Sequence, residues 1–97
     1  FSYKYIFSRQ IQALGRQGDI LFSISSSGQS PNVLEAIKMA NNLNLTTISL
    51  LGKLGGKAFD ISHKSIVIPS DSTARVQEMQ LLVIHILCEL IETQLGL

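Results

Sequence analysis

One stretch, ILFSISSSGQSPNV at residues 20–33, restricts the fold of this chain more than any other. Its first six residues form an apolar run typical of a buried β-strand, and Ser30-Pro31 is typical of the start of an α-helix. A short loop of serines and one glycine separates the two. A strand that leads through a polar loop into a helix is the building unit of parallel α/β folds.

The rest of the chain alternates in the same way. Apolar spacing predicts helices at 4–17, 31–43 and 74–95, and β-branched and apolar runs predict strands at 20–25, 45–52 and 64–69. The segment GKLGGKAF at 52–59 is predicted to be a turn-prone loop. We therefore predict an α/β domain, a three-layer parallel sheet with flanking helices. A parallel sheet needs covered faces and protected edges, so three strands indicate that part of the sheet lies outside this chain.

The final predicted helix carries many apolar residues. Those expected to contact the core are Val76, Met79, Val83, Ile86, Leu90 and Ile91.

Composition excludes several classes of protein. Hydrophobic residues make up 45% of the 97 residues, too many for a disordered chain, and a net charge of +1 without a basic run predicts no nucleic-acid or membrane partner. The longest apolar stretch, 81–88, is interrupted by a histidine and is shorter than the ~20 residues of a membrane span. Cys88 is the only cysteine, so no intrachain disulfide forms and a reducing, cytoplasmic location is expected.

The serine loop, defined as residues 25–30, follows a strand at the place where parallel α/β proteins bind ligands. Free N–H groups and the dipole at the start of the next helix favour an anion such as phosphate. Hydroxyls would add donors from Ser25, Ser26, Ser27 and Ser30, and Gly28 would let the backbone approach the anion closely. An ordinary polar turn with Ser30 as helix cap remains the alternative. The spacing matches neither nucleotide-binding glycine motif, so a small phosphorylated molecule is expected.

Two histidines and a charge pair are open to different interpretations. His85 lies in LLVIHILC, and a lone histidine in an apolar helix is more often packed than catalytic. His63 precedes a predicted strand and is expected at the surface. Arg75 and Glu78 are spaced as an ordinary i, i+3 pair.

The motif S-x-S-G-x-S in GDILFSISSSGQSPNVLEAI resembles the signature of the sugar-isomerase (SIS) domain family. The opening FSYKYIFSRQIQALGRQGD, the loop LLGKLGGKAFD and the tail SDSTARVQEMQLLVIHILCELIE are similar to the phosphoheptose isomerases of that family. The resemblance implies a five-stranded sheet, of which residues 1–97 would be the C-terminal portion of a single SIS domain. It also implies an isomerase that converts D-sedoheptulose 7-phosphate to D-glycero-D-manno-heptose 7-phosphate for the lipopolysaccharide core.

The same resemblance assigns roles to individual residues. Ser25, Ser26, Ser27 and Ser30 would bind the substrate phosphate. Gln77 would bind substrate or metal, His85 would be a general acid or base, and both would be ligands of a zinc cofactor. The absent portion would add a histidine and a glutamate, so this chain alone is expected to be inactive. Gln80 stands where histidine is common in the family, which we interpret as a peripheral change.

Gln77 and His85 are eight residues apart, which places them roughly 12 Å apart along a helix and about 80° apart around it. One zinc at ~2 Å from both is hard to build from a single helix. We therefore predict a site assembled between subunits of a homotetramer, with Gln77 from one chain and His85 from another.

Two other functions remain open. Related non-catalytic SIS proteins associate as tetramers with the bacterial replication initiator, but they tend to carry asparagine at the position of His85, which favours the enzyme. SIS domains of transcription regulators sense sugar phosphates, but no DNA-binding segment accompanies this sequence.

Overall fold

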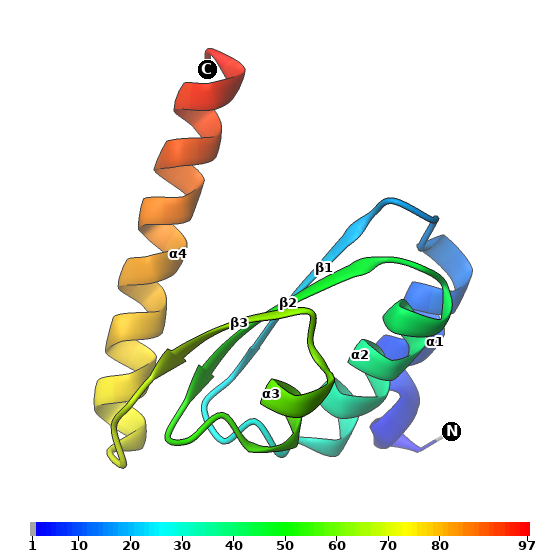
Figure 1. Cartoon of the computed structure of the whole chain (residues 1–97), viewed down its shortest axis with the longest axis horizontal. Coiled ribbons are helices and arrows are strands. Elements are labelled where there is room, and N and C mark those ends of the chain that lie inside the picture. Colours follow the sequence, from blue (N-terminus) through cyan, green and yellow to red (C-terminus); the bar gives the residue numbers. More distant parts are fainter. Residues whose placement is uncertain (1) are drawn as a thin grey trace.

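The three predicted strands form one parallel sheet in the computed structural model, which describes residues 2–97. The strands are β1 (Ile20–Ser25), β2 (Thr46–Gly52) and β3 (Lys64–Ile68), in the order β1-β2-β3. The central strand β2 pairs with both neighbours, and its buried residues include Leu50 and Leu51 on opposite faces. All three strands run the same way, so their carboxyl ends lie at one edge of the sheet (Figure 1).

Helices cover both faces of this sheet. They are the short 3-10 turn η1 (Tyr3–Tyr5) and the helices α1 (Ile6–Leu14), α2 (Pro31–Asn42), α3 (Gly56–Ile61) and α4 (Thr73–Leu95). Helices α1, α2 and α3 lie on one side, and the long helix α4 lies on the other (Figure 1). The predicted three-layer parallel sheet with flanking helices is therefore confirmed.

The core lies between the sheet and the side that carries α2 and α3. Ile37 of α2, Leu51 of β2 and Ala58 of α3 are fully buried and pack together. Partly buried neighbours surround them: Leu21, Val33, Leu34, Ile61 and Val67. The apolar stripe of the second predicted helix thus faces the sheet, as its spacing indicates.

The segment predicted to be a turn-prone loop at 52–59 is partly wrong, because α3 begins inside it at Gly56. Gly55 precedes this helix at φ +90°, a left-handed conformation that glycine adopts without a steric penalty. The glycines that suggested a loop therefore make one tight turn, after which KAFDI continues as helix.

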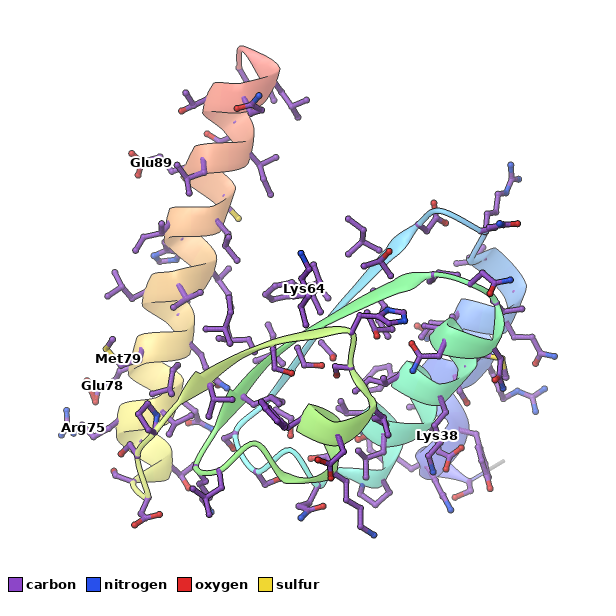
Figure 2. The ribbon with its side chains drawn as sticks, viewed as in Figure 1. Lys38, Lys64, Arg75, Glu78, Met79 and Glu89 are labelled. Carbon is purple, nitrogen blue, oxygen red and sulfur yellow. The ribbon has the colours of Figure 1, made fainter. Side chains whose placement is uncertain are left out.

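The core assignment for the last helix is largely wrong in the described chain. Val76 is fully buried, but four others are between 45% and 60% exposed: Met79, Ile86, Leu90 and Ile91. The reason is geometric, because α4 packs on the sheet only through its first turns and then leaves it (Figure 1). Arg75, Glu78, Met79 and Glu89 lie on its outer side, turned away from the sheet (Figure 2).

An apolar groove of about 740 Å³ separates the second half of α4 from the sheet. Its walls are mainly aliphatic side chains of the two elements, including Ile24, Ile48, Ile66, Ile84 and Leu87. A solvent-exposed groove of this composition is unusual for a finished domain surface. None of the described helices is long and apolar enough to span a membrane.

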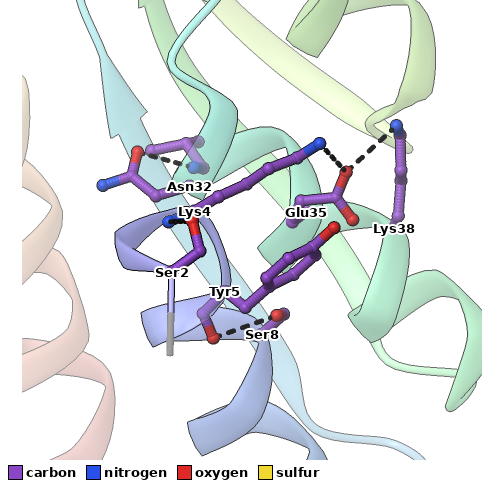
Figure 3. A network of polar contacts seen from close by, with 8 residues as sticks. Ser2, Lys4, Tyr5, Ser8, Asn32, Glu35 and Lys38 are labelled. Atoms are coloured by element: carbon purple, nitrogen blue, oxygen red, sulfur yellow. Dashed lines mark hydrogen bonds and ion pairs between the residues drawn. The ribbon is translucent and has the colours of Figure 1, made fainter.

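The N-terminal turn is attached to the helix that follows the serine loop. Lys4 Nζ lies 3.9 Å from a carboxylate oxygen of Glu35 on α2, and Lys38 Nζ lies 3.5 Å from the same oxygen (Figure 3). Ser8, buried in α1, donates its hydroxyl to the carbonyl of Tyr5. Exposed ion pairs stabilise little, so these contacts orient η1 against α2 more than they add stability.

Candidate functional site

The serine loop lies at the carboxyl edge of the sheet, as predicted. Strand β1 ends at Ser25, and α2 begins at Pro31. The turn that joins β2 to α3 and the start of α4 lie at the same edge (Figure 1). Ser25 is buried, whereas Ser26, Ser27 and Ser30 are half-buried. Two other strand-to-helix connections thus lie beside the loop, at the edge where parallel sheets bind ligands.

The loop is organised by hydrogen bonds of its own. Ser25 Oγ accepts from the Gly28 N–H at 3.0 Å and lies 3.4 Å from Ser30 Oγ. Ser27 Oγ accepts from the Gln29 N–H at 3.1 Å. The two amides use only oxygen lone pairs, so the Ser27 hydroxyl keeps its proton for another acceptor, whereas Ser25 and Ser30 share one proton between their oxygens. Ser26 Oγ has no hydrogen-bond partner among the described residues, so its donor and acceptor sites are open.

The start of α2 offers fewer free N–H groups than its sequence suggests. Pro31 has none, and the Val33 N–H is bonded to the Asn32 side chain at 2.9 Å. Ser30 occupies the N-cap position, and its carbonyl accepts from Leu34, but its side chain makes no capping bond. The Ser30 side chain therefore does not act as an ordinary helix cap, although the residue occupies the N-cap position.

The backbone of the tight turn between β2 and α3 packs directly against the backbone of the serine loop. Gly28 has φ +67°, and a Cβ added to it would overlap the Gly55 carbonyl. A Cβ on Gly56 would lie 2.6 Å from the Ser27 carbonyl oxygen. The Gly28 carbonyl also accepts from the Ala58 N–H at 3.0 Å. The two backbones therefore touch at positions where only glycine fits.

Helix α4 begins at the same edge. Ser72 caps it, accepting from the Arg75 N–H at 3.4 Å, and Arg75 binds Glu78 through two contacts of 2.6 and 3.0 Å, which confirms the predicted pair. Val76 is fully buried against the sheet, and the next residue, Gln77, is exposed. The first turn of α4 thus holds Gln77 close to the end of the sheet that carries the serine loop.

His85 is not brought to the serine loop by this chain. It is exposed, nine residues beyond the buried Val76, which is about 14 Å further along the helix. It has no hydrogen-bond partner in the described chain, so the interpretation of a packed structural histidine is wrong here.

Zinc ligands do not converge within one chain. No group of three or more His, Cys, Asp or Glu side chains among residues 2–97 is placed to hold a metal ion. Gln77 and His85 lie on one straight helix, eight residues apart. The zinc that the resemblance implies therefore does not fit the described residues of a single chain.

Sequence reasoning missed two contacts. Gln80, interpreted as a peripheral change, is 5% exposed and donates from Nε2 to the Leu50 carbonyl at 3.2 Å. His63 is exposed as predicted, but its Nδ1 accepts from the Thr47 N–H at 2.9 Å. A glutamine one turn beyond a buried valine on an otherwise apolar face is the signal that could have indicated the first of these contacts.

Comparison with known proteins agrees with this geometry. Residues 1–52 match the model of the SIS domain family. The phosphoheptose isomerase of Campylobacter jejuni is 49% identical over 92 residues, which is 95% of this chain and 50% of that protein. The phosphoheptose isomerase of Helicobacter pylori is 48% identical over 95% of this chain and 48% of its own length. The chain thus spans about half the length of the curated relatives it matches.

Solved structures show the same fold. The phosphoheptose isomerase of Neisseria gonorrhoeae superimposes with a TM-score of 0.91 at 40% identity, over 94% of this chain and 51% of that one. The phosphoheptose isomerase of Francisella tularensis gives a TM-score of 0.91 at 36% identity, over 94% and 49%. With its serine signature in the matched segment, this chain belongs to the SIS domain family.

Proposed function

We propose that this chain is the C-terminal portion of a single SIS domain, residues 1–97, in a phosphoheptose isomerase. Its relatives of that name are about twice as long. The open groove beside α4 and the exposed Ile20, Phe22 and Ile24 of edge strand β1 are surfaces that further strands and helices would cover. The remainder of the domain is the occupant that these surfaces fit best.

The proposed reaction converts D-sedoheptulose 7-phosphate to D-glycero-D-manno-heptose 7-phosphate, a heptose for the lipopolysaccharide core. One proton leaves C1 and one is delivered to C2, while the carbonyl passes from C2 to C1 through an enediol. The reaction needs no net oxidant. It needs a group that binds the phosphate and an acid or base that moves protons at C1 and C2.

The observation that carries this proposal is the serine loop at the carboxyl edge of the sheet, beside the first turn of α4, in a chain so similar to enzymes of this name. Ser25, Ser26, Ser27 and Ser30 bind the phosphate in the proposed complex. Gln77 contacts the sugar, and His85 is the general acid or base, since an imidazole exchanges protons near neutral pH.

We place the active site between subunits of a homotetramer in the cytoplasm. Gln77 and His85 of one helix are too far apart to hold one ligand atom, so His85 is supplied by another chain. Zinc belongs to the proposal only as an ion held between chains or by residues outside this one, and no step is assigned to it. Metal analysis of the purified protein tests its presence.

The comparisons give no support to the alternative of a non-catalytic SIS protein that associates with the replication initiator. The decisive experiment incubates the protein that contains the whole domain with sedoheptulose 7-phosphate and follows the aldose product. Turnover is expected from that protein and not from residues 1–97 alone. No turnover by the whole protein, or full turnover by the short chain, contradicts the proposal.

A further inference from the structure

Gly52 is a point of contact between three parts of the site. It is the last residue of β2, and a Cβ added to it would lie 2.7 Å from the Ser26 carbonyl oxygen and 2.9 Å from Val76 Cγ2, and would overlap Val76 Cγ1. Gly52 ends a regular strand, so its conformation does not require glycine. The requirement is one of space, because the serine loop and α4 both rest on this residue.

Gln80 makes the second attachment of α4 to the same strand. It lies one helical turn beyond Val76, and its hydrogen bond reaches Leu50, two residues before Gly52. A buried side-chain amide is expensive to leave unpaired, so this bond fixes the rotation and height of the helix on β2. The two attachments together bracket Gln77, which lies between them on α4.

We propose that Gly52 and Gln80 are positioning residues that fix the separation between the serine loop and the first two turns of α4. Neither residue touches the substrate. They act through Ser26 on one side and through Gln77 on the other, so that the bound phosphate and the sugar-contacting helix are held at one spacing. The catalytic part of this inference rests on the proposed function, whereas the structural part stands on the contacts alone.

The first test is Gly52→Ala in the protein that contains the whole domain. The added methyl displaces the Ser26 carbonyl and the Val76 side chain at once. We expect the affinity for inorganic phosphate to fall about tenfold. The kcat for sedoheptulose 7-phosphate should fall by about 10- to 100-fold, since a misplacement of about 1 Å is enough for such a loss.

Adding Val76→Ala separates the two effects. It removes both methyl carbons that the new Cβ would meet on α4, but it leaves the contact with the Ser26 carbonyl. The double variant is therefore expected to recover part of the kcat that Gly52→Ala loses, because α4 is no longer displaced, while its phosphate affinity stays at the Gly52→Ala value. A merely structural role for Gly52 would move both quantities together, and that outcome overturns the proposal.

Gln80→Met keeps the volume and removes the donor, so it tests α4 without touching the loop. We expect a lower kcat, unchanged phosphate affinity, and an altered amide NMR shift at Gln77. Gly18→Ala is the control for backbone strain away from the site: Gly18 has φ +92°, so alanine is strained there and should lower stability, but its Cβ would enter open space at the far end of the sheet. It should leave kcat and phosphate affinity unchanged.

Folding is checked by circular dichroism. If Gly52→Ala does not fold, Gln80→Met decides: unchanged kcat and an unchanged Gln77 shift overturn the proposal. If the unsubstituted protein turns over no sugar, the proposed function fails, but the phosphate affinities and the Gln77 shifts still test the positioning role.

Discussion

Ser23 and Ser49 face each other across β1 and β2, with their Oγ atoms 2.8 Å apart in a buried layer. Ser49 Oγ is also 2.6 Å from Ser62 Oγ, and Ser62 donates to the Ala58 carbonyl at the end of α3. A chain of hydroxyls therefore joins two strands to the helix that supports the serine loop. Ser65 lies opposite Ser49 on β3, yet its buried hydroxyl has no hydrogen-bond partner.

This difference predicts opposite effects of the same substitution. Ser49→Ala leaves Ser23 and Ser62 without their shared partner and should lower the free energy of unfolding by about 1–3 kcal/mol. Ser65→Ala removes an unpaired polar atom and should be neutral or stabilising. Urea denaturation of the two variants measures the difference. Equal losses of stability would show that the hydroxyl chain is not what stabilises this layer.

The serines of the loop should fall into two classes. Ser25→Ala removes the acceptor of the Gly28 N–H, so it should lower both thermal stability and phosphate affinity. Ser26→Ala removes a hydroxyl with no partner in the described chain, so it should weaken phosphate binding by about tenfold at unchanged stability. Ser26→Thr is the control and should bind like the unsubstituted protein. NMR titration with inorganic phosphate measures the affinity of the three variants, and thermal denaturation measures their stability. A Ser26→Ala variant with full phosphate affinity contradicts the assignment of Ser26 to phosphate binding.

His85→Ala is expected to abolish turnover while phosphate affinity and thermal stability stay unchanged, because this exposed side chain makes no hydrogen bond within the described chain. His63→Ala is the matched control. It removes the acceptor of the Thr47 N–H and should lower stability by about 1 kcal/mol without abolishing turnover. A His85→Ala enzyme with normal kcat would remove this residue from the mechanism.

Subunit mixing tests the proposal that the active site is shared between subunits. Gln77→Ala and His85→Ala proteins should each be inactive, but co-assembled tetramers should regain part of the activity, because some sites receive an intact Gln77 from one chain and an intact His85 from another. The control is a protein that carries both substitutions, mixed with either single variant. These mixtures should show no activity, because no site can receive both an intact Gln77 and an intact His85. If the co-assembled variants stay inactive while mixed tetramers are shown to form, both side chains act from the same subunit.

The sequence was sufficient to predict those elements whose position follows from neighbouring residues alone. The strand at 20–25 and the helix starting at Pro31 are where the sequence predicts them, because a short apolar run before a polar loop and a proline at the first helical position leave few other structures. The predicted burial of that strand is wrong on one face, since Ile20, Phe22 and Ile24 are exposed in the described chain. Helix α3 was missed because two glycines hide its start, and its formation depends on contact with Gly28 across the chain.

The outer part of α4 could not be predicted for a different reason. Its apolar residues lie all around the helix, a pattern typical of complete burial, and no local signal shows which face meets the sheet. Gln80 was undervalued because its importance comes from Leu50, thirty residues earlier. The serine loop was located correctly, but the division of its hydroxyls between those that shape the loop and those proposed to bind a ligand depends on distances that sequence spacing does not contain.

Because α4 is attached to the sheet only near its start, any tilt of the helix would pivot about Val76. A tilt of about 5° there would move His85 by about 1 Å and Leu95 by about 2.5 Å, since each residue adds about 1.5 Å of length. A small displacement caused by an added methyl group near Val76 therefore grows toward the C-terminal end of the helix. In the proposed assembly, the surface that receives the far end of α4 must also hold it still, so the precision of the proposed site depends on both ends of this one helix.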